Sequence, residues 1–349
     1  MSRTRTNTRS LLLLPSLIVA SICFAQQQKP KLPQVEKQDD DVVRIDTALV
    51  TVTVNAKQRH GKGVPSLKRE DFHLYEDGVE QEVVYFESPK ELEATKSTTS
   101  PFTVALLLDV SDSTEFKIAQ IRQAAIAFID QLQADDRVLV VAFDKRVQIL
   151  AEATNNRKDV REAINRIHTG GGTSLYSAIE IVLGRLRTIA GRKAIVLFTD
   201  GVDTASIDAT IDSTVAAAER SDAAIYPIQY NTYGDFIDNP SRQTGAAEGL
   251  STTAHATKNG ELASEVYKRG TNYLRLLAER TGGSMQYSDS IKNLSRSFTR
   301  IVAKLRQQYT LGYYPKNRVI NGTQRQIKVR VDVPEVEVST RKSYVFAPR

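Results

Sequence analysis

The sequence predicts an α/β fold, in which a doubly wound, mostly parallel sheet is inserted into a small antiparallel β unit built from the N- and C-terminal segments. Two observations support this prediction. Strands that are apolar throughout alternate with amphipathic helices in the middle of the chain, and short strands of alternating polarity occupy both ends. The apolar share of 41% and the charged share of 25% are those of an ordinary globular protein.

The β unit is expected from the two ends of the chain. The first block contains "TALVTVTVNA" and "REDFHLYEDGVEQEVVYF", which alternate with period two around an Asp77-Gly78 turn. The second contains "YTLGYYP", "RQIKVRVDV" and "VEVSTRKSYVF". Each block has about forty residues of strand pattern, which is close to the lower limit for independent folding. We therefore expect the blocks to pair with each other. Two separate hairpins leaning on the central domain are the alternative.

The central segment predicts the parallel sheet. Apolar strands and helices of 3.6-residue periodicity follow one another, which indicates a sheet covered by helices on both faces. The expected strands are 103–110, 136–144, 193–200, 223–230 and 284–288, and the expected helices are 116–132, 157–168, 174–189, 207–220, 272–283 and 291–308.

The N-terminus has the layout of a secretory signal peptide: three arginines, an apolar run, and a small residue at Ala25. We expect residues 1–25 to be removed, 26–41 to be a polar tether, 42–90 and 308–349 to form the β unit, and 101–307 to form the central domain. The mature protein would be secreted, periplasmic or in the cell envelope. A retained membrane anchor and a lipoprotein attached through Cys23 are the alternatives.

Charge and cysteine content exclude several classes of function. Cys23 is the only cysteine, so the mature chain would have neither a disulfide framework nor a thiolate metal site. Loss of the three signal-peptide arginines lowers the formal net charge from +6 to +3. No cluster of basic and aromatic residues is present, so nucleic acid is not an expected partner.

Oxygen-bearing side chains gather where the predicted parallel strands end. Asp109, Ser111 and Ser113 leave the first strand, Asp200 ends another, and Thr173 follows three glycines in "HTGGGTS". The carboxyl ends of parallel strands share one edge of the sheet, where ligands bind. Two carboxylates and three hydroxyls suit a hard divalent cation, Mg²⁺ or alternatively Mn²⁺ or Ca²⁺.

These three motifs together closely resemble a von Willebrand factor type A domain with a metal-ion-dependent adhesion site, over residues 101–307. That family has D-x-S-x-S after a strand, a threonine in a glycine-containing loop and an aspartate in a T-D-G turn, in the same order as here. The flanking segments "EDFHLYEDGVEQEVVYF" and "QYTLGYYP" resemble a bacterial secreted family related to it, of the acidobacterial type.

The resemblance implies a Rossmann-like fold and a binding function. Ser111, Ser113 and, in the ligand-competent state, Thr173 would contact the metal, and Asp109 and Asp200 would hold it directly or through water. A Glu or Asp side chain of a partner protein would complete the coordination. The expected function is thus metal-dependent protein binding or adhesion, with no small-molecule substrate and with membranes contacted only by association.

Two other functions stay open. The chain could be a structural protein of the cell envelope in which the metal only stabilises a loop. A hydrolase is the remoter alternative, because a serine nucleophile needs a base and only His168 is close in sequence to the predicted site, without a G-x-S-x-G elbow. We therefore do not expect an enzyme. "HTGGGTS" also lacks the lysine of a phosphate-binding P-loop.

A long polar stretch, 231–265, follows the strand 223–230 and leaves the sheet at the same edge. We expect it to help select the partner, with Tyr233, Asp235 and Phe236 as candidate contacts. A solvated insertion without a function is the alternative.

Overall fold

The computed structural model describes residues 49–59, 66–89, 102–111, 114, 118–230, 250–251, 256–257, 262–288, 291–319 and 321–346. These residues all belong to one compact unit, Thr47–Arg349. The predicted signal peptide and tether lie outside the described residues. Of the helices described, none is long and apolar enough to cross a membrane.

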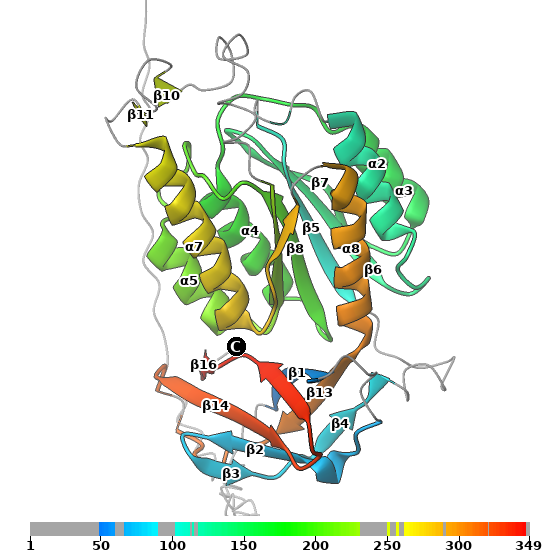
Figure 1. The fold of residues 1–349 in the computed structure, drawn as a ribbon, viewed down its shortest axis with the longest axis vertical. Coiled ribbons are helices and arrows are strands. Elements are labelled where there is room, and N and C mark those ends of the chain that lie inside the picture. The colour runs from blue at the N-terminus through cyan, green and yellow to red at the C-terminus, as the bar shows by residue number, and fades with distance from the viewer. Residues whose placement is uncertain are drawn as a thin grey trace, which may run out of the picture. The chain divides into compact units, whose positions relative to one another are not determined.

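A six-stranded sheet forms the centre of the α/β part, with the strand order β12-β9-β8-β5-β6-β7 (Figure 1). Its strands are parallel except β7, which runs antiparallel to β6. Every residue of β5, β8 and β9 is buried, because helices cover both faces. The strands are β5 (Thr103–Asp109), β6 (Arg137–Phe143), β7 (Val147–Thr154), β8 (Lys193–Thr199), β9 (Ala224–Tyr230) and β12 (Gln286–Ser288).

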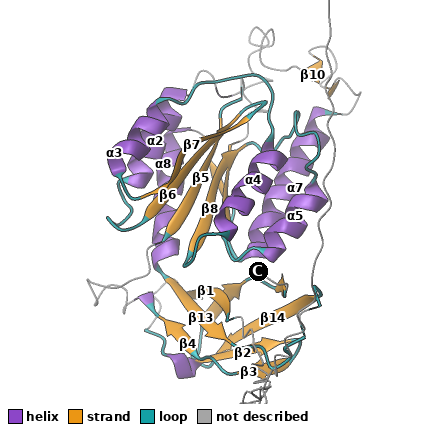
Figure 2. Cartoon of the chain, turned by 180° about the vertical axis from the view of Figure 1, so that it is seen from behind, coloured by secondary structure: helices purple, strands orange, loops and turns teal. Residues whose placement is uncertain are grey.

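Three helices pack on each face of this sheet (Figure 2). Side chains alternate along β5, so Leu106 and Leu108 pack on one face and Leu107 on the other. The first face is covered by α2 (Ile118–Ile129), α3 (Arg157–Asn165) and α8 (Ile291–Arg306), and the second by α4 (Leu175–Arg187), α5 (Ile211–Arg220) and α7 (Ala263–Thr281). The predicted doubly wound α/β class is confirmed.

Strands from both ends of the chain pair in two four-stranded antiparallel sheets, with the orders β15-β1-β13-β4 and β16-β14-β2-β3. Val52 of β1 lies opposite Leu311 of β13, and Leu74 of β2 lies opposite Val329 of β14; all four belong to one apolar core. The elements are β1 (Val50–Gln58), the 3-10 helix η1 (Arg69–Asp71), β2 (Phe72–Glu76), β3 (Val79–Gln81), β4 (Tyr85–Glu87), β13 (Gln308–Tyr313), β14 (Gln324–Val331), β15 (Val336–Thr340) and β16 (Ser343–Val345). We call these strands the β unit.

Hydrogen bonds connect the β unit to the α/β part. The Arg341 guanidinium, which is buried, donates to the backbone carbonyls of Glu219 and Ser221 at the end of α5. The Gln308 amide also donates to the Tyr226 hydroxyl on β9. A short hairpin of β10 (Leu250–Ser251) and β11 (Ala256–Thr257) completes the described elements.

Three elements differ from the sequence prediction. The strand β7 was not predicted, since it is an edge strand that is only partly buried and its polarity alternates weakly. Helix α5 begins at Ile211 rather than at residue 207, because the Thr210 side chain accepts a hydrogen bond from the Ser213 amide and so caps the helix there. Helix α7 begins at Ala263 rather than at residue 272, and its first half contains Gly270.

Candidate metal centre

The order of the strands brings two aspartates to one edge of the sheet. β5 lies between β6, which follows it in sequence, and β8, which is reached only after β7. Such a switch point is where open α/β sheets bind ligands, beyond the carboxyl ends of the strands. Asp109 is the last residue of β5, and Asp200 directly follows β8. Because β5 and β8 are parallel neighbours, the two residues lie at the same edge.

Asp109 is held by three short hydrogen bonds. Its side chain is buried, and one carboxylate oxygen accepts from the amide and the hydroxyl of Ser111, at 3.1 and 2.7 Å. The other oxygen accepts from the Thr199 hydroxyl at 2.7 Å. Thr199 is the last residue of β8, so its hydroxyl connects the two strand ends. These bonds fix the orientation of the carboxylate.

The glycine loop runs alongside the end of β5. The Gly170 amide donates to the Val110 carbonyl at 3.0 Å, and Gly170 forms a parallel bridge with Ser111. A Cβ atom on Gly170 would overlap the carboxylate of Asp144, with only 2.9 Å to the Asp144 Cγ. A side chain at position 170 would therefore require the Asp144 side chain or the loop to shift.

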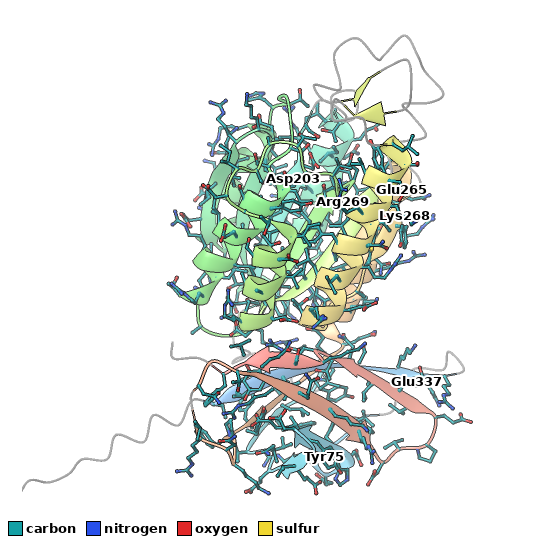
Figure 3. The ribbon with its side chains drawn as sticks, turned by 90° about the vertical axis from the view of Figure 1, so that its left-hand side faces the viewer. Tyr75, Asp203, Glu265, Lys268, Arg269 and Glu337 are labelled. Atoms are coloured by element: carbon teal, nitrogen blue, oxygen red, sulfur yellow. The ribbon has the colours of Figure 1, made fainter. Side chains whose placement is uncertain are left out.

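Thr173 is connected through its backbone to the loop after β8. Its amide donates to the Thr204 hydroxyl at 2.9 Å, and its carbonyl accepts from the amides of Thr204 and Ala205. The same loop caps helix α4, since the Asp203 carboxylate (Figure 3) accepts from the Tyr176 amide at 2.9 Å. The position of Thr173 is thus determined by backbone contacts and by the start of α4.

Asp200 lies in a turn that packs closely against α7. Its carboxylate accepts from the Val202 amide at 3.0 Å, and its carbonyl accepts from the Gln229 side chain at 2.9 Å. Gly201 follows with φ of +91°, and a Cβ there would lie 2.9 Å from the Gly270 backbone. The close approach of two glycines allows α7 to support the turn.

The electrostatics of Asp109 are unfavourable for a buried carboxylate. Burial and the neighbouring charge of Asp200 raise the pKa of Asp109 to about 7, against the lowering effect of the Thr199 and Ser111 hydrogen bonds. In the part of the chain that the structure describes, no basic side chain forms an ion pair with Asp109. Ionisation of Asp109 beside Asp200 is therefore unfavourable.

The donors at this edge fit a hard divalent cation. Asp109 and Asp200 supply carboxylate oxygens, and Ser111 and Thr173, both buried, supply hydroxyls. Mg²⁺ and similar ions prefer such oxygen ligands and commonly keep bound water. Among the described residues no group of three or more His, Cys, Asp or Glu side chains is placed to hold a metal ion. Any site here would thus combine two carboxylates with hydroxyls.

The sequence prediction does not include one residue of the site, and four residues that it does include lie outside the described residues. Thr199 was not selected, although a hydroxyl at the end of a buried strand, directly before Asp200, was a usable signal. Ser113 lies outside the described residues, and so do the three candidate partner contacts Tyr233, Asp235 and Phe236. Their roles stay predictions.

Comparison with known proteins adds a family assignment for part of the chain. Residues 104–202 match the family model described as von Willebrand factor type A domain. The matched segment includes the described residues Asp109, Ser111, Thr173 and Asp200, and also Ser113. An uncharacterized protein of Synechocystis sp. is 33% identical over 108 residues, which are 29% of this chain and 25% of that relative. The chain therefore matches about a quarter of the length of that relative.

The chain is also similar to solved structures of low sequence identity. A von Willebrand factor type A protein from Catenulispora acidiphila is 13% identical, with 79% of this chain and 74% of that chain covered and a TM-score of 0.46. Proximal thread matrix protein 1 from the mussel byssus, with a zinc-occupied MIDAS motif, is 16% identical, with 60% and 46% covered and a TM-score of 0.40.

Proposed function

We propose that this chain is an exported, divalent-metal-dependent protein-binding module. Asp109, Ser111, Ser113, Thr173 and Asp200 would hold Mg²⁺, and an acidic side chain of a partner protein would bind at the remaining coordination position. The metal supplies positive charge and an open position for a carboxylate; Mn²⁺ or Ca²⁺ could supply the same.

One observation carries this proposal: Asp109 and Asp200 lie together at a strand edge, and only hydroxyl and amide donors surround the buried Asp109. Two buried like charges are costly unless a cation neutralises them. With a divalent ion the pair is nearly neutral, so an additional carboxylate from a partner would be attracted without strong repulsion.

The surroundings of the pair favour a preformed site. Thr173 is fixed by backbone bonds to the loop after β8, and the Ser111 hydroxyl is oriented by Asp109 at 2.7 Å. Ligands held this way lose little conformational freedom on binding, which favours affinity. The match of residues 104–202 to the von Willebrand factor type A model spans all five proposed ligands and supports the same function.

Export and domain organisation belong to the same proposal. Cleavage after Ala25 would release a chain whose tether, 26–41, leads into a β unit of 42–90 and 308–349 around a domain of 101–307. We propose a binding module and not an enzyme. Of the two described histidines, His73 is bonded to Glu80 and Asp332 in the β unit, and His168 is exposed, two residues before Gly170.

Thermal unfolding in chelator and in ~10 mM Mg²⁺ or Mn²⁺ tests the metal. With a dissociation constant near ~1 mM, the ion stabilises the native state by about 1.4 kcal/mol, which raises Tm by roughly 3 to 5 °C. We expect this rise in the wild type and in Asp135→Ala, an exposed aspartate, and its loss in Asp109→Ala. Equal Tm values with and without metal in the wild type would contradict the proposal and favour a structural protein of the cell envelope.

A further inference from the structure

The loops after β6 and β8 flank the glycine loop that carries Thr173. Three side-chain atoms converge on Gly172, whose φ is +74°. The Cβ atoms of Ala205 and Lys145 and the hydroxyl of Thr204 would lie 3.5, 3.6 and 3.6 Å from a Cβ placed there. Lys145 of the first loop and Thr204 and Ala205 of the second therefore lie beside the residue that precedes Thr173.

The loop after β6 carries two neighbouring basic residues. The Lys145 amide donates to the Gly171 carbonyl at 3.0 Å, and the Arg146 amide donates to the Asp144 carboxylate at 2.6 Å. Both side chains are exposed, and neither forms an ion pair or a side-chain hydrogen bond with another described residue. Two basic side chains are thus exposed on this loop without a partner among the described residues.

Lys268, another basic residue, has an acidic neighbour on its own helix. Lys268, on the first turns of α7, lies 3.7 Å from Glu265 of the same helix (Figure 3). Its charge is therefore partly balanced within the helix, whereas the charges of Lys145 and Arg146 are available to a ligand.

The loop after β8 carries an exposed apolar side chain. Ile207 is 91% exposed, more than any other large apolar residue that the structure describes. Its loop is fixed, because Asp203 accepts from the amide and the hydroxyl of Ser206 at 3.0 and 2.6 Å, and Ala209 is buried. An isoleucine held at the tip of a rigid loop offers a ready apolar contact to a ligand.

The two loops differ in charge. Asp208, adjacent to Ile207, is also exposed. The side of the site with Ile207 is therefore apolar and acidic, whereas the side with Lys145 and Arg146 is basic. A ligand with a second negative charge is attracted on the basic side and repelled on the other.

We propose that the partner binds through an acidic segment of protein whose metal-binding Asp or Glu is flanked by a second acidic residue on one side and by an apolar residue on the other. The second acidic residue pairs with Lys145 and Arg146, and the apolar residue packs on Ile207. This inference rests on the proposed metal-dependent function, and it adds the chemistry and the orientation of the partner.

Selection from a phage-displayed library of random peptides, on the full chain in Mg²⁺ and separately in chelator, tests the inference. We expect metal-dependent enrichment of peptides with two acidic residues and one large apolar residue in a fixed order. A synthetic consensus peptide should bind about tenfold more weakly to Lys145→Glu/Arg146→Glu and to Ile207→Ser. Replacing its second acidic residue by lysine should restore binding to the charge-reversed variant.

Matched controls carry the same changes elsewhere. Lys158→Glu on α3 and Ile181→Ser on α4 alter exposed residues outside the two loops and should leave the affinity within about twofold of the wild type. Enrichment of peptides without this pattern, the absence of any enriched peptide, or equal affinity of the loop variants would overturn the inference.

The thermal assay separates this failure from failure of the metal proposal. Because Lys145, Arg146 and Ile207 are not proposed ligands, their variants should keep the full metal-dependent rise in Tm. A normal rise without peptide selection overturns only the partner chemistry, whereas no rise in the wild type overturns the metal-dependent function itself.

Discussion

Two buried carboxylates in this molecule have opposite environments. Glu76, in the β unit, is 3% exposed and faces a guanidinium: the Arg325 Nη1 atom lies 2.7 Å from one oxygen. The hydroxyls of Tyr313 and Tyr344 both donate to the other oxygen at 2.6 Å. Arg325 also donates to two backbone carbonyls and stacks over the Phe346 ring at 4.4 Å.

Asp109 is buried equally well, but in the described part of the chain it has no cationic partner of this kind. Its three donors are the amide and hydroxyl of Ser111 and the hydroxyl of Thr199, and its charged neighbour is Asp200. The charge of Glu76 is balanced by Arg325, whereas no basic side chain among the described residues balances that of Asp109. The contrast indicates that the first cluster supports the β unit, and it is consistent with the proposal that the second receives a cation.

The largest change in unfolding free energy is expected where the buried ion pair of Glu76 and Arg325 is broken. Arg325→Leu leaves Glu76 buried without its cation, which should lower the free energy of unfolding by about 3 to 5 kcal/mol in urea titrations. Glu76→Gln combined with Arg325→Met removes both charges and should recover most of this loss. A loss below about 1 kcal/mol for the single variant would show that the pair does not support the β unit.

The second effect concerns the glycine loop that supports the cation site. Gly170→Ala places a methyl group against the Asp144 carboxylate, and relief of this overlap should cost about 1 to 3 kcal/mol of unfolding free energy. Because Gly170 bridges to Ser111, the metal-dependent rise in Tm should also decrease. Gly184→Ala is the control, since a Cβ there meets nothing within 4 Å and α4 should gain about 0.5 to 1 kcal/mol. Equal stability of the two variants would mean that the loop is free to move away.

The same contrast shows which parts of the structure the sequence could predict. Continuous apolar strands indicated a parallel sheet, and residues at the ends of such strands share an edge, so Asp109 and Asp200 could be placed together. Glu76 and Arg325 could not, because they lie 249 positions apart on strands whose pairing depends on the whole β unit. Alternation shows which residues face inward, but not which of them meet.

Helix α7 illustrates a second limit. Gly270 weakens the helical pattern of its first half, so the predicted start was later than the observed one. The reason for this glycine is tertiary: a Cβ on Gly270 would lie 2.6 Å from the Gly201 carbonyl oxygen, in the turn that holds Asp200. Local propensity is sacrificed here for close packing at the site, and a single sequence does not show that exchange.

The third prediction tests the imbalance at Asp109 itself. The pKa of Asp109 is raised to about 7 from 3.8, so the native state binds an extra proton between these values. Without metal, the unfolding free energy of the wild type should therefore fall as pH rises from 4 through 7. Asp109→Asn cannot titrate and should therefore lack this fall. Its side-chain oxygen can still accept from Ser111, and its amide can donate to Thr199.

At pH 8, Mg²⁺ should stabilise the wild type but not Asp109→Asn. Wild type should gain about 1.4 kcal/mol from a tenfold excess of Mg²⁺ over its dissociation constant, and Asp109→Asn should gain nothing. Urea unfolding at several pH values, with chelator and with Mg²⁺, measures both effects. A wild type whose metal-free stability is constant between pH 4 and 8 would contradict the like-charge interpretation of the Asp109 environment.

The smallest effect is expected at an exposed cluster, where solvent screens the charges. His73 lies between two carboxylates, 2.8 Å from a Glu80 oxygen and 2.9 Å from an Asp332 oxygen. The hydrogen bond to Glu80, followed by that to Asp332, raises the pKa of His73 above 6.5. The stabilisation is thus complete below pH 6.5 and is lost as pH rises through the higher native pKa.

His73→Gln should therefore lower the unfolding free energy by less than about 1 kcal/mol at pH 5.5 and leave it unchanged at pH 9. Glu80→Gln, which keeps the histidine but removes the first carboxylate, should show a smaller loss with the same sign. A loss at pH 5.5 as large as that of Arg325→Leu would break the comparison, because exposure would then not separate a screened ion pair from a buried one. A small, pH-dependent loss would show that burial separates the screened ion pairs of His73 from the stabilising pair of Glu76 and Arg325.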